Sequence, residues 1–243
     1  MGSYFDKYDR HGAVHWNATN WLRLKYNAPL VSRYSTLIKE IPPEAKKILD
    51  IGCGDGYLAS RIALSFPSAT VVGVDQETAG VRIAREKCAG IHNVQFMVSA
   101  GEGLEFEDQS FDVVVLADVI EHLGNPDRMV GEIARVLSRE GTAIITTPNR
   151  QDGSKWDPRH DHEYTGNELK LALSAHFANV KMIGSWPMSA VRQWRAKGAG
   201  RLYLDVLARA GFNHFDKEMI DPSVDYGQLT AVVSGPRAAS QIH

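Results

Sequence analysis

Short apolar runs, rich in valine and isoleucine, alternate along this 243-residue chain with longer segments whose apolar residues recur at helical spacing. The runs are typical of buried strands, because a strand covered on both faces of a sheet has no polar side. They predict strands at residues 47–51, 70–75, 93–98, 111–116, 141–147, 179–184 and 227–234. The helical spacing predicts helices at residues 27–40, 57–66, 77–89, 126–138 and 165–177.

The alternation predicts an α/β fold, because a helix between two strands returns the chain so that the strands run parallel. We expect one seven-stranded, mostly parallel sheet with helices on both faces. A chain of this length suits a single domain, residues 1–243, with a sizeable core.

Two segments depart from this alternation. Residues 1–26 are rich in aromatic residues and histidine without clear periodicity, so they form either an arm packed on the core or a lid over a pocket. Residues 185–225 contain a helical stretch from about 189 to 210 and a loop from Gly211 to Pro222. We expect this second segment to be an insertion before the last strand, at 226–235, that either caps a site or covers a sheet edge.

Composition narrows the class of protein. Hydrophobic residues make up 44% of the chain, charged residues 23%, and the net charge is −2, which argues against a nucleic-acid-binding protein or a polybasic membrane protein. No apolar run approaches the ~20 residues of a membrane span, and the first residues lack the apolar stretch of a secretion signal. Cys53 and Cys88 are too few for a disulfide framework or a zinc cluster. We expect a cytoplasmic protein without a membrane partner; its oligomeric state stays open.

The chemistry begins where the strand at 47–51 ends. Gly52, Gly54 and Gly56 alternate there with Cys53 and Asp55. Glycine accepts positive φ and lets a ligand approach the backbone, so this turn predicts a nucleotide-sized cradle at the carboxyl edge of the sheet.

The spacing of this turn discriminates between nucleotides. The dinucleotide pattern G-x-G-x-x-G needs a glycine where this chain has Tyr57, and the loop lacks the Lys-Ser/Thr of a phosphate-binding loop. Asp75 ends the next strand, close to the ~20 residues expected before an acid that binds ribose hydroxyls. A ribose without pyrophosphate favours S-adenosylmethionine (SAM).

Four blocks, LDIGCGDG, VVGVD, FDVVVLADVIEHL and EIARVLSREGTAIITTPN, resemble the class I SAM-dependent methyltransferases in order and spacing. The resemblance covers roughly residues 45–150 and implies a Rossmann-like SAM-binding core at 45–184 with an antiparallel last strand. It implies that the glycines and Cys53 lie under the methionine moiety, that Asp50 orients the cofactor ammonium, and that Asp75 accepts from the ribose. The product of the cofactor is then S-adenosylhomocysteine.

The adenine loop departs from the family pattern. Ala100 stands where the family usually has an acid that accepts from the adenine amino group. Adenine is instead expected to contact backbone around Ala100 and Gly101, or the side chains of Ser99 or Glu102, with stacking from Gln76.

Two clusters carry the candidate catalytic groups. Asp118, Glu121 and His122 follow the fourth strand, whose carboxyl end faces the methyl group in the family; Asp118 is expected to line the cofactor pocket. His160 and His162 follow the fifth strand. A histidine titrates near neutral pH, so His122, His160 or His162 is a candidate base, or else a simple loop hydrogen-bonding group.

A metal is the alternative for these clusters. Asp118, Glu121 and His122 with His160 or His162 resemble the metal-binding set of the small-RNA 2′-O-methyltransferases. Asp118 is shorter than the expected glutamate, and similar motifs occur in metal-free small-molecule methyltransferases, so we predict no bound metal. Just after His162, Thr165 with Glu168 predicts a helix capping box.

These observations predict methyl transfer from SAM to a small molecule, at a hydroxyl oxygen, as in small-molecule biosynthesis. The alternatives are a metal-dependent RNA 3′-terminal 2′-O-methyltransferase and a SAM-binding regulatory or partner protein without catalysis. A basic stretch in the insertion either attracts an anionic acceptor or is a solvated helix face: Arg192, Arg195, Lys197 and Arg201.

Overall fold

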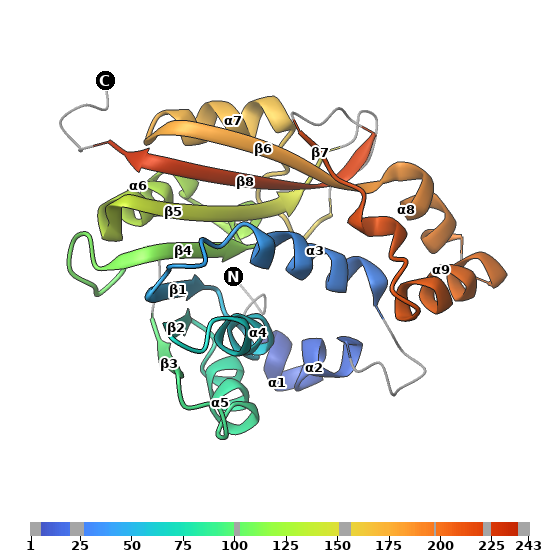
Figure 1. Cartoon of the computed structure of the whole chain (residues 1–243), viewed down its shortest axis with the longest axis horizontal. Coiled ribbons are helices and arrows are strands. Elements are labelled where there is room, and N and C mark those ends of the chain that lie inside the picture. The colour runs from blue at the N-terminus through green and yellow to red at the C-terminus, as the bar shows by residue number, and fades with distance from the viewer. Residues whose placement is uncertain are drawn as a thin grey trace.

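The computed structural model describes residues 6–19, 27–99, 103–150, 157–196, 198–220 and 225–237. One eight-stranded sheet runs through its centre in the order β3-β2-β1-β4-β5-β8-β6-β7 (Figure 1). The strands are β1 (Lys47–Ile51), β2 (Thr70–Asp75), β3 (Val94–Val98), β4 (Phe111–Ala117), β5 (Leu137–Pro148), β6 (Phe177–Pro187), β7 (Met219–Ile220) and β8 (Tyr226–Pro236).

The strand directions confirm a mostly parallel sheet. The five neighbouring strands β3, β2, β1, β4 and β5 pair in parallel, and β8 lies between β5 and β6 and runs antiparallel to both. All seven predicted strands are present, so the count of seven is wrong by one. The eighth, β7, has two residues paired with Ile183 and Gly184 of β6, too few to leave a periodic pattern in the sequence.

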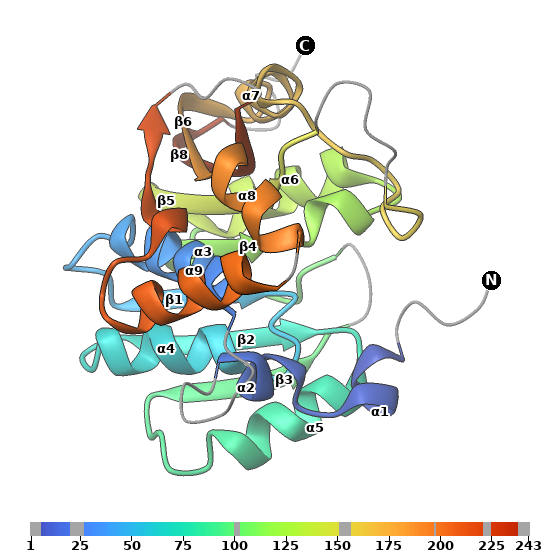
Figure 2. The same ribbon diagram turned by 90° about the vertical axis from the view of Figure 1, so that its right-hand side faces the viewer.

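Helices cover both faces of the sheet (Figures 1 and 2). They are α1 (Lys7–His11), α2 (Val14–Thr19), α3 (Ala28–Lys39), α4 (Tyr57–Ser65), α5 (Thr78–Lys87), α6 (Pro126–Val136), α7 (Gly166–Ser174), α8 (Met188–Arg195) and α9 (Ala199–Arg209). The predicted capping box is confirmed: the Glu168 backbone N–H donates to the Thr165 hydroxyl, and the Glu168 carboxylate accepts from the Thr165 backbone N–H at 2.8 Å.

Strand β4 shows why these runs are wholly apolar. Val113 and Val115 belong to the core beneath α3, α4 and α5, whereas Val114 and Leu116 belong to the core beneath α6 and α7. All four side chains are fully buried. A strand between two helical layers has no solvent face, which removes the polar alternation.

The insertion is not one helix, as the sequence predicted, but two. Helix α8 ends at Arg195 with Ala196 as its C-cap, and Gly198, whose φ is 76°, is the N-cap of α9; glycine adopts this positive φ without a steric penalty. Ala190, Leu204 and Phe215 of this insertion form a small buried core against Ala28 at the start of α3.

Candidate functional site

The three glycines between β1 and α4 all adopt the left-handed conformation. Their φ values are 73° at Gly52, 52° at Gly54 and 74° at Gly56. The backbone N–H groups of Gly52 and Cys53 donate to the Val74 carbonyl at 2.8 and 3.0 Å, which fastens the turn to β2. The predicted cradle is therefore present and held against the neighbouring strand.

Side chains from other segments lie against these glycines. A Cβ at Gly52 would collide with Val119, which follows β4, and a Cβ at Gly54 would collide with the Tyr8 hydroxyl. At Gly56 it would lie 2.6 Å from the Ala84 Cβ. The turn thus needs glycine both for its conformation and for close approach.

Asp75 lies beside the turn, as the spacing predicted. Its carboxylate accepts from the backbone N–H groups of Gly54 and Glu77, each at 2.8 Å. Burial raises the pKa of Asp75 above its ordinary value. A carboxylate offers about four acceptor positions, more than these two N–H groups use, so it can also accept from a ribose hydroxyl.

Asp50 is buried and incompletely bonded. Its Oδ2 atom has no hydrogen-bond partner among the described residues, and 1% of the residue's surface is exposed. Burial, reinforced by the charge of Asp75, raises the pKa of Asp50 to about 8. An orphaned carboxylate oxygen under the glycine turn fits a cationic group such as the ammonium of SAM.

Some of the other residues predicted to bind the cofactor are described by the structure, and others are not. Gln76 is exposed, and the Cys53 side chain is buried, which raises the pKa of its thiol and suits packing rather than nucleophilic chemistry. Ala100, Gly101 and Glu102 lie outside the described residues, as does Lys197 of the basic stretch, so their predicted roles stay predictions.

The N-terminal arm closes directly over the glycine turn, a relationship without a sequence signal. The Asp55 carboxylate accepts from the His15 backbone N–H at 2.8 Å and lies 2.9 Å from the His15 Nδ1 atom. Trp16 donates its indole N–H to the Asp55 carbonyl at 2.8 Å, and the Tyr8 backbone N–H donates to Glu77. The described part of the arm is therefore packed on the core, and a role as a lid over a substrate pocket stays a prediction.

Asp118 lies at the end of β4 in a strained left-handed conformation, with a φ of 51°. Its carboxylate pairs with Arg33 of α3 and accepts from the Thr146 hydroxyl at 2.8 Å and the Gln228 amide at 2.7 Å. These bonds tie Asp118 to the protein, and its predicted contact with the cofactor stays a prediction. Sequence reasoning missed Arg33, because a single arginine in a helix gives no signal.

Glu121, His122 and His160 lie close together at the carboxyl ends of β4 and β5. The His122 and His160 ring centroids lie 4.9 Å apart. The Glu121 carboxyl accepts from the Thr147 hydroxyl at 3.0 Å, and burial raises the pKa of Glu121 to about 7. Potential ligand atoms of the three residues lie within 4.8 Å of one another, a spacing that fits a divalent cation.

Hydrogen bonds set the tautomers of both histidines. His122 Nδ1 lies 2.9 Å from the Arg159 carbonyl oxygen, and His160 Nδ1 lies 2.8 Å from a Glu163 carboxylate oxygen. Since both partners only accept, Nδ1 carries the proton in each ring, and the Nε2 of a neutral ring keeps a lone pair. Such an Nε2 can accept a proton or bind a metal.

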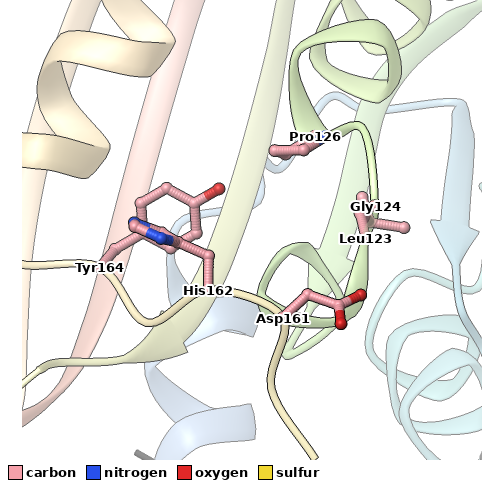
Figure 3. A pocket seen from close by; sticks show the side chains of 6 residues that line it. All are labelled: Leu123, Gly124, Pro126, Asp161, His162 and Tyr164. Carbon is pink, nitrogen blue, oxygen red and sulfur yellow. The ribbon is translucent and has the colours of Figure 1, made fainter.

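The ring of His162 is not part of this cluster, although its backbone N–H donates to the Glu121 carbonyl at 3.1 Å. Its ring packs on Tyr164 with centroids 4.5 Å apart. Figure 3 shows both side chains on one side of an open pocket of about 370 Å³, facing the segment that carries Leu123 and Pro126. Of the predicted metal set, the structure gathers Glu121, His122 and His160, and leaves out Asp118 and His162.

The family model for a methyltransferase domain matches residues 43–199. The chain belongs to this methyltransferase family. The α/β fold class with a mostly parallel sheet therefore agrees with the expectation from sequence, apart from the eighth strand, and SAM is the methyl donor that membership implies. Within the described residues, no helix of this methyltransferase is long and apolar enough to cross a membrane.

The proteins that this chain resembles include two relatives and one solved structure. A probable S-adenosylmethionine-dependent methyltransferase of Mycobacterium tuberculosis is 32% identical over 186 residues, 73% of this chain and 66% of the relative. The mitochondrial ubiquinone biosynthesis O-methyltransferase of Arabidopsis thaliana is 28% identical, over 60% of this chain and 50% of its own length. A SAM-dependent methyltransferase from Thermotoga maritima shares the fold with a TM-score of 0.65 at 17% identity, over 95% and 99% of the two chains.

Proposed function

We propose that this methyltransferase transfers the methyl group of SAM to a hydroxyl oxygen of a small molecule. The observation that carries the proposal is the pair of neighbouring histidine rings, His122 and His160, on the segments that follow β4 and β5. Val119 lies against Gly52, so the segment that bears His122 adjoins the turn. Methylation of a hydroxyl requires removal of its proton, and a neutral imidazole is suited to accept it near pH 7.

SAM supplies a methyl group already activated by a sulfonium. The protein's task is therefore to hold donor and acceptor in line and to accept one proton. Asp50 would hold the ammonium and Asp75 the ribose, which fixes the donor against the glycine turn. As the new C–O bond forms and the C–S bond breaks, the hydroxyl proton passes to Nε2 of His122 or His160, leaving a methyl ether and S-adenosylhomocysteine.

Relatives support transfer to oxygen. The Arabidopsis protein is named an O-methyltransferase of ubiquinone biosynthesis, and a Bartonella tribocorum relative of the same name is 29% identical over 58% of this chain. The chain spans about two thirds or less of these relatives, so their substrate is no more than a guide. Phenolic and catecholic hydroxyls are accordingly the first acceptors to test.

The cluster of Glu121, His122 and His160 favours a second candidate, metal-assisted transfer. Each histidine donates Nδ1–H to a carbonyl or carboxylate, the arrangement that usually orients histidine ligands of metals. A divalent cation there would lower the pKa of a coordinated hydroxyl in place of a base. Such a site could serve a small molecule or the 3′-terminal 2′-hydroxyl of RNA.

The experiment combines an acceptor panel with metal removal. Formation of S-adenosylhomocysteine is measured with phenols, catechols and a short RNA, using enzyme treated with EDTA and then resupplied with Mg²⁺, Mn²⁺ or Zn²⁺. Turnover of a phenol or catechol that survives EDTA supports the base mechanism. Loss on EDTA treatment with recovery on resupply supports the metal, and SAM binding without turnover of any acceptor supports a regulatory SAM-binding protein.

A further inference from the structure

The outer side of helix α9 is apolar and exposed. Leu202, Tyr203 and Val206 lie on one side of the helix and are 66%, 55% and 55% exposed; Phe212, just past its end, is 70% exposed. The opposite side of α9, with Leu204, is buried in the core of the insertion. The helix is therefore apolar on two sides, and the fold covers one of them.

The same segment is basic in an otherwise acidic protein. Residues 188–218 contain six Lys and Arg against three Asp and Glu, a net charge of +3, whereas the rest of the chain sums to −5. Arg192 and Arg195 of α8 and Arg201 and Arg209 of α9 are all exposed. The Arg201 guanidinium lies 4.2 Å from the centroid of the Trp194 ring, and Arg201 and Arg209 each interact with Asp205, four residues away along the helix.

We propose that this α9 face, defined as Leu202, Tyr203, Val206 and Phe212 with the neighbouring arginines, docks on an anionic phospholipid surface. The apolar side chains would enter the boundary between headgroups and acyl chains, and the arginines would contact phosphates. Tyr203 suits that boundary, because its ring is apolar and its hydroxyl is polar.

The positive charge around the α9 face favours an anionic lipid surface over a second copy of the chain as its partner. A two-fold dimer would set the same face against itself and so bring two groups of arginines together. An anionic membrane instead neutralises them, at about 1 kcal/mol per basic residue near the surface. The net charge of −2 for the whole chain conceals this local excess of positive charge.

The location of the face suits docking. Helices α8 and α9 lie at the end of the sheet where β1, β4 and β5 end, the end that carries the glycine turn and the histidines (Figures 1 and 2). A protein docked through α9 would therefore hold that end of the sheet near the membrane.

The test is co-sedimentation of the full chain with vesicles of phosphatidylcholine, with or without phosphatidylglycerol. We expect binding to vesicles that contain phosphatidylglycerol, weakened by salt, and about tenfold or greater loss in the triple variant Leu202→Ser/Val206→Ser/Phe212→Ser. Leu171→Ser is the matched control, since Leu171 of α7 is 76% exposed and lies outside the insertion.

Two further measurements test the role of the arginines and the folding of the variants. Arg201→Gln/Arg209→Gln should remove the preference for phosphatidylglycerol, and circular dichroism with thermal melting should show that every variant is folded. Equal sedimentation of the wild type with and without vesicles, or of the triple variant and the wild type with them, would overturn the proposal. So would light scattering that shows a dimer of the wild type and a monomer of the triple variant.

Discussion

The Nδ1 atom of His122 lies 2.9 Å from the backbone carbonyl oxygen of Arg159. This bond joins the loop after β4 to the loop after β5 and fixes the proton on Nδ1, so that Nε2 is the acceptor of the neutral ring. Burial lowers the pKa of His122 below its ordinary value, which favours that neutral ring. The two loops thus present an imidazole prepared to accept a proton.

Replacing His122 tests this role. We expect His122→Gln to lower kcat by about 10²–10⁴-fold while the Kd for SAM stays within about twofold, because the ring acts on the acceptor and not on the cofactor. The matched control is His162→Gln, since the His162 ring packs on Tyr164 and is not one of the three side chains of the cluster, and we expect it to have a much smaller effect. Equal losses of kcat and SAM affinity in His122→Gln would contradict the base.

Asp75 is predicted to bind the ribose. Asp75→Ala should weaken SAM binding by about 1–3 kcal/mol, measured by calorimetry, through loss of charge-assisted hydrogen bonds. Asp112→Ala is the control, since Asp112 also accepts from two backbone N–H groups but lies at the opposite, amino end of the parallel strands. Unchanged affinity in Asp75→Ala would refute the ribose assignment.

The raised pKa of Asp50 predicts that SAM binding releases a proton. A pKa of about 8 leaves the carboxyl mainly protonated at pH 7 without ligand, and a nearby ammonium favours the ionised form. SAM binding at pH 7 should therefore release close to one proton, and affinity should rise from pH 6 to pH 8. Calorimetry in phosphate and Tris buffers measures the release, and Asp50→Asn should abolish it. A release that persists in Asp50→Asn would assign the proton elsewhere.

The same shift has a consequence for stability. The folded protein holds the Asp50 proton more tightly than the unfolded chain, so this group makes the free energy of unfolding fall as pH rises from about 4 to about 8. Denaturant titrations of ligand-free protein should show that fall, and Asp50→Asn should be less sensitive to pH over the same interval. An identical pH dependence in both proteins would contradict the raised pKa.

The arm should loosen when its anchor is removed. Asp55→Ala leaves the His15 backbone and ring donors without their carboxylate, a cost of about 1–3 kcal/mol for the docked arm. We expect faster hydrogen exchange in α2 and weaker SAM binding, with the exchange of β4 unchanged. Protection of α2 equal to that of the wild type would show that other contacts hold the arm.

The sequence predicted what depends on local pattern. The apolar runs of β1 and β4, the glycine turn, Asp75 and the Thr165 capping box all have periodic or spacing signals, and all lie where they were expected. Two-residue β7 and the break at Gly198 are too short or too local to alter a periodicity.

The missed features depend on contacts between distant segments. The Arg33–Asp118 pair and the His15–Asp55 contact join residues whose separation along the chain carries no pattern. The metal hypothesis shows, in turn, that residues close together in the sequence need not have their side chains close together in the fold. Its five candidate ligands lie in two short motifs, yet the fold brings together three of them and pairs Asp118 with Arg33.

The most direct test of the account is a crystal structure of the protein with S-adenosylhomocysteine. We expect the ribose hydroxyls within about 2.6–3.2 Å of the Asp75 carboxylate, the ammonium beside Asp50, and the sulfur directed toward His122 and His160. A ligand bound away from the glycine turn, or one whose sulfur faces away from both histidines, would contradict the proposed site and its mechanism.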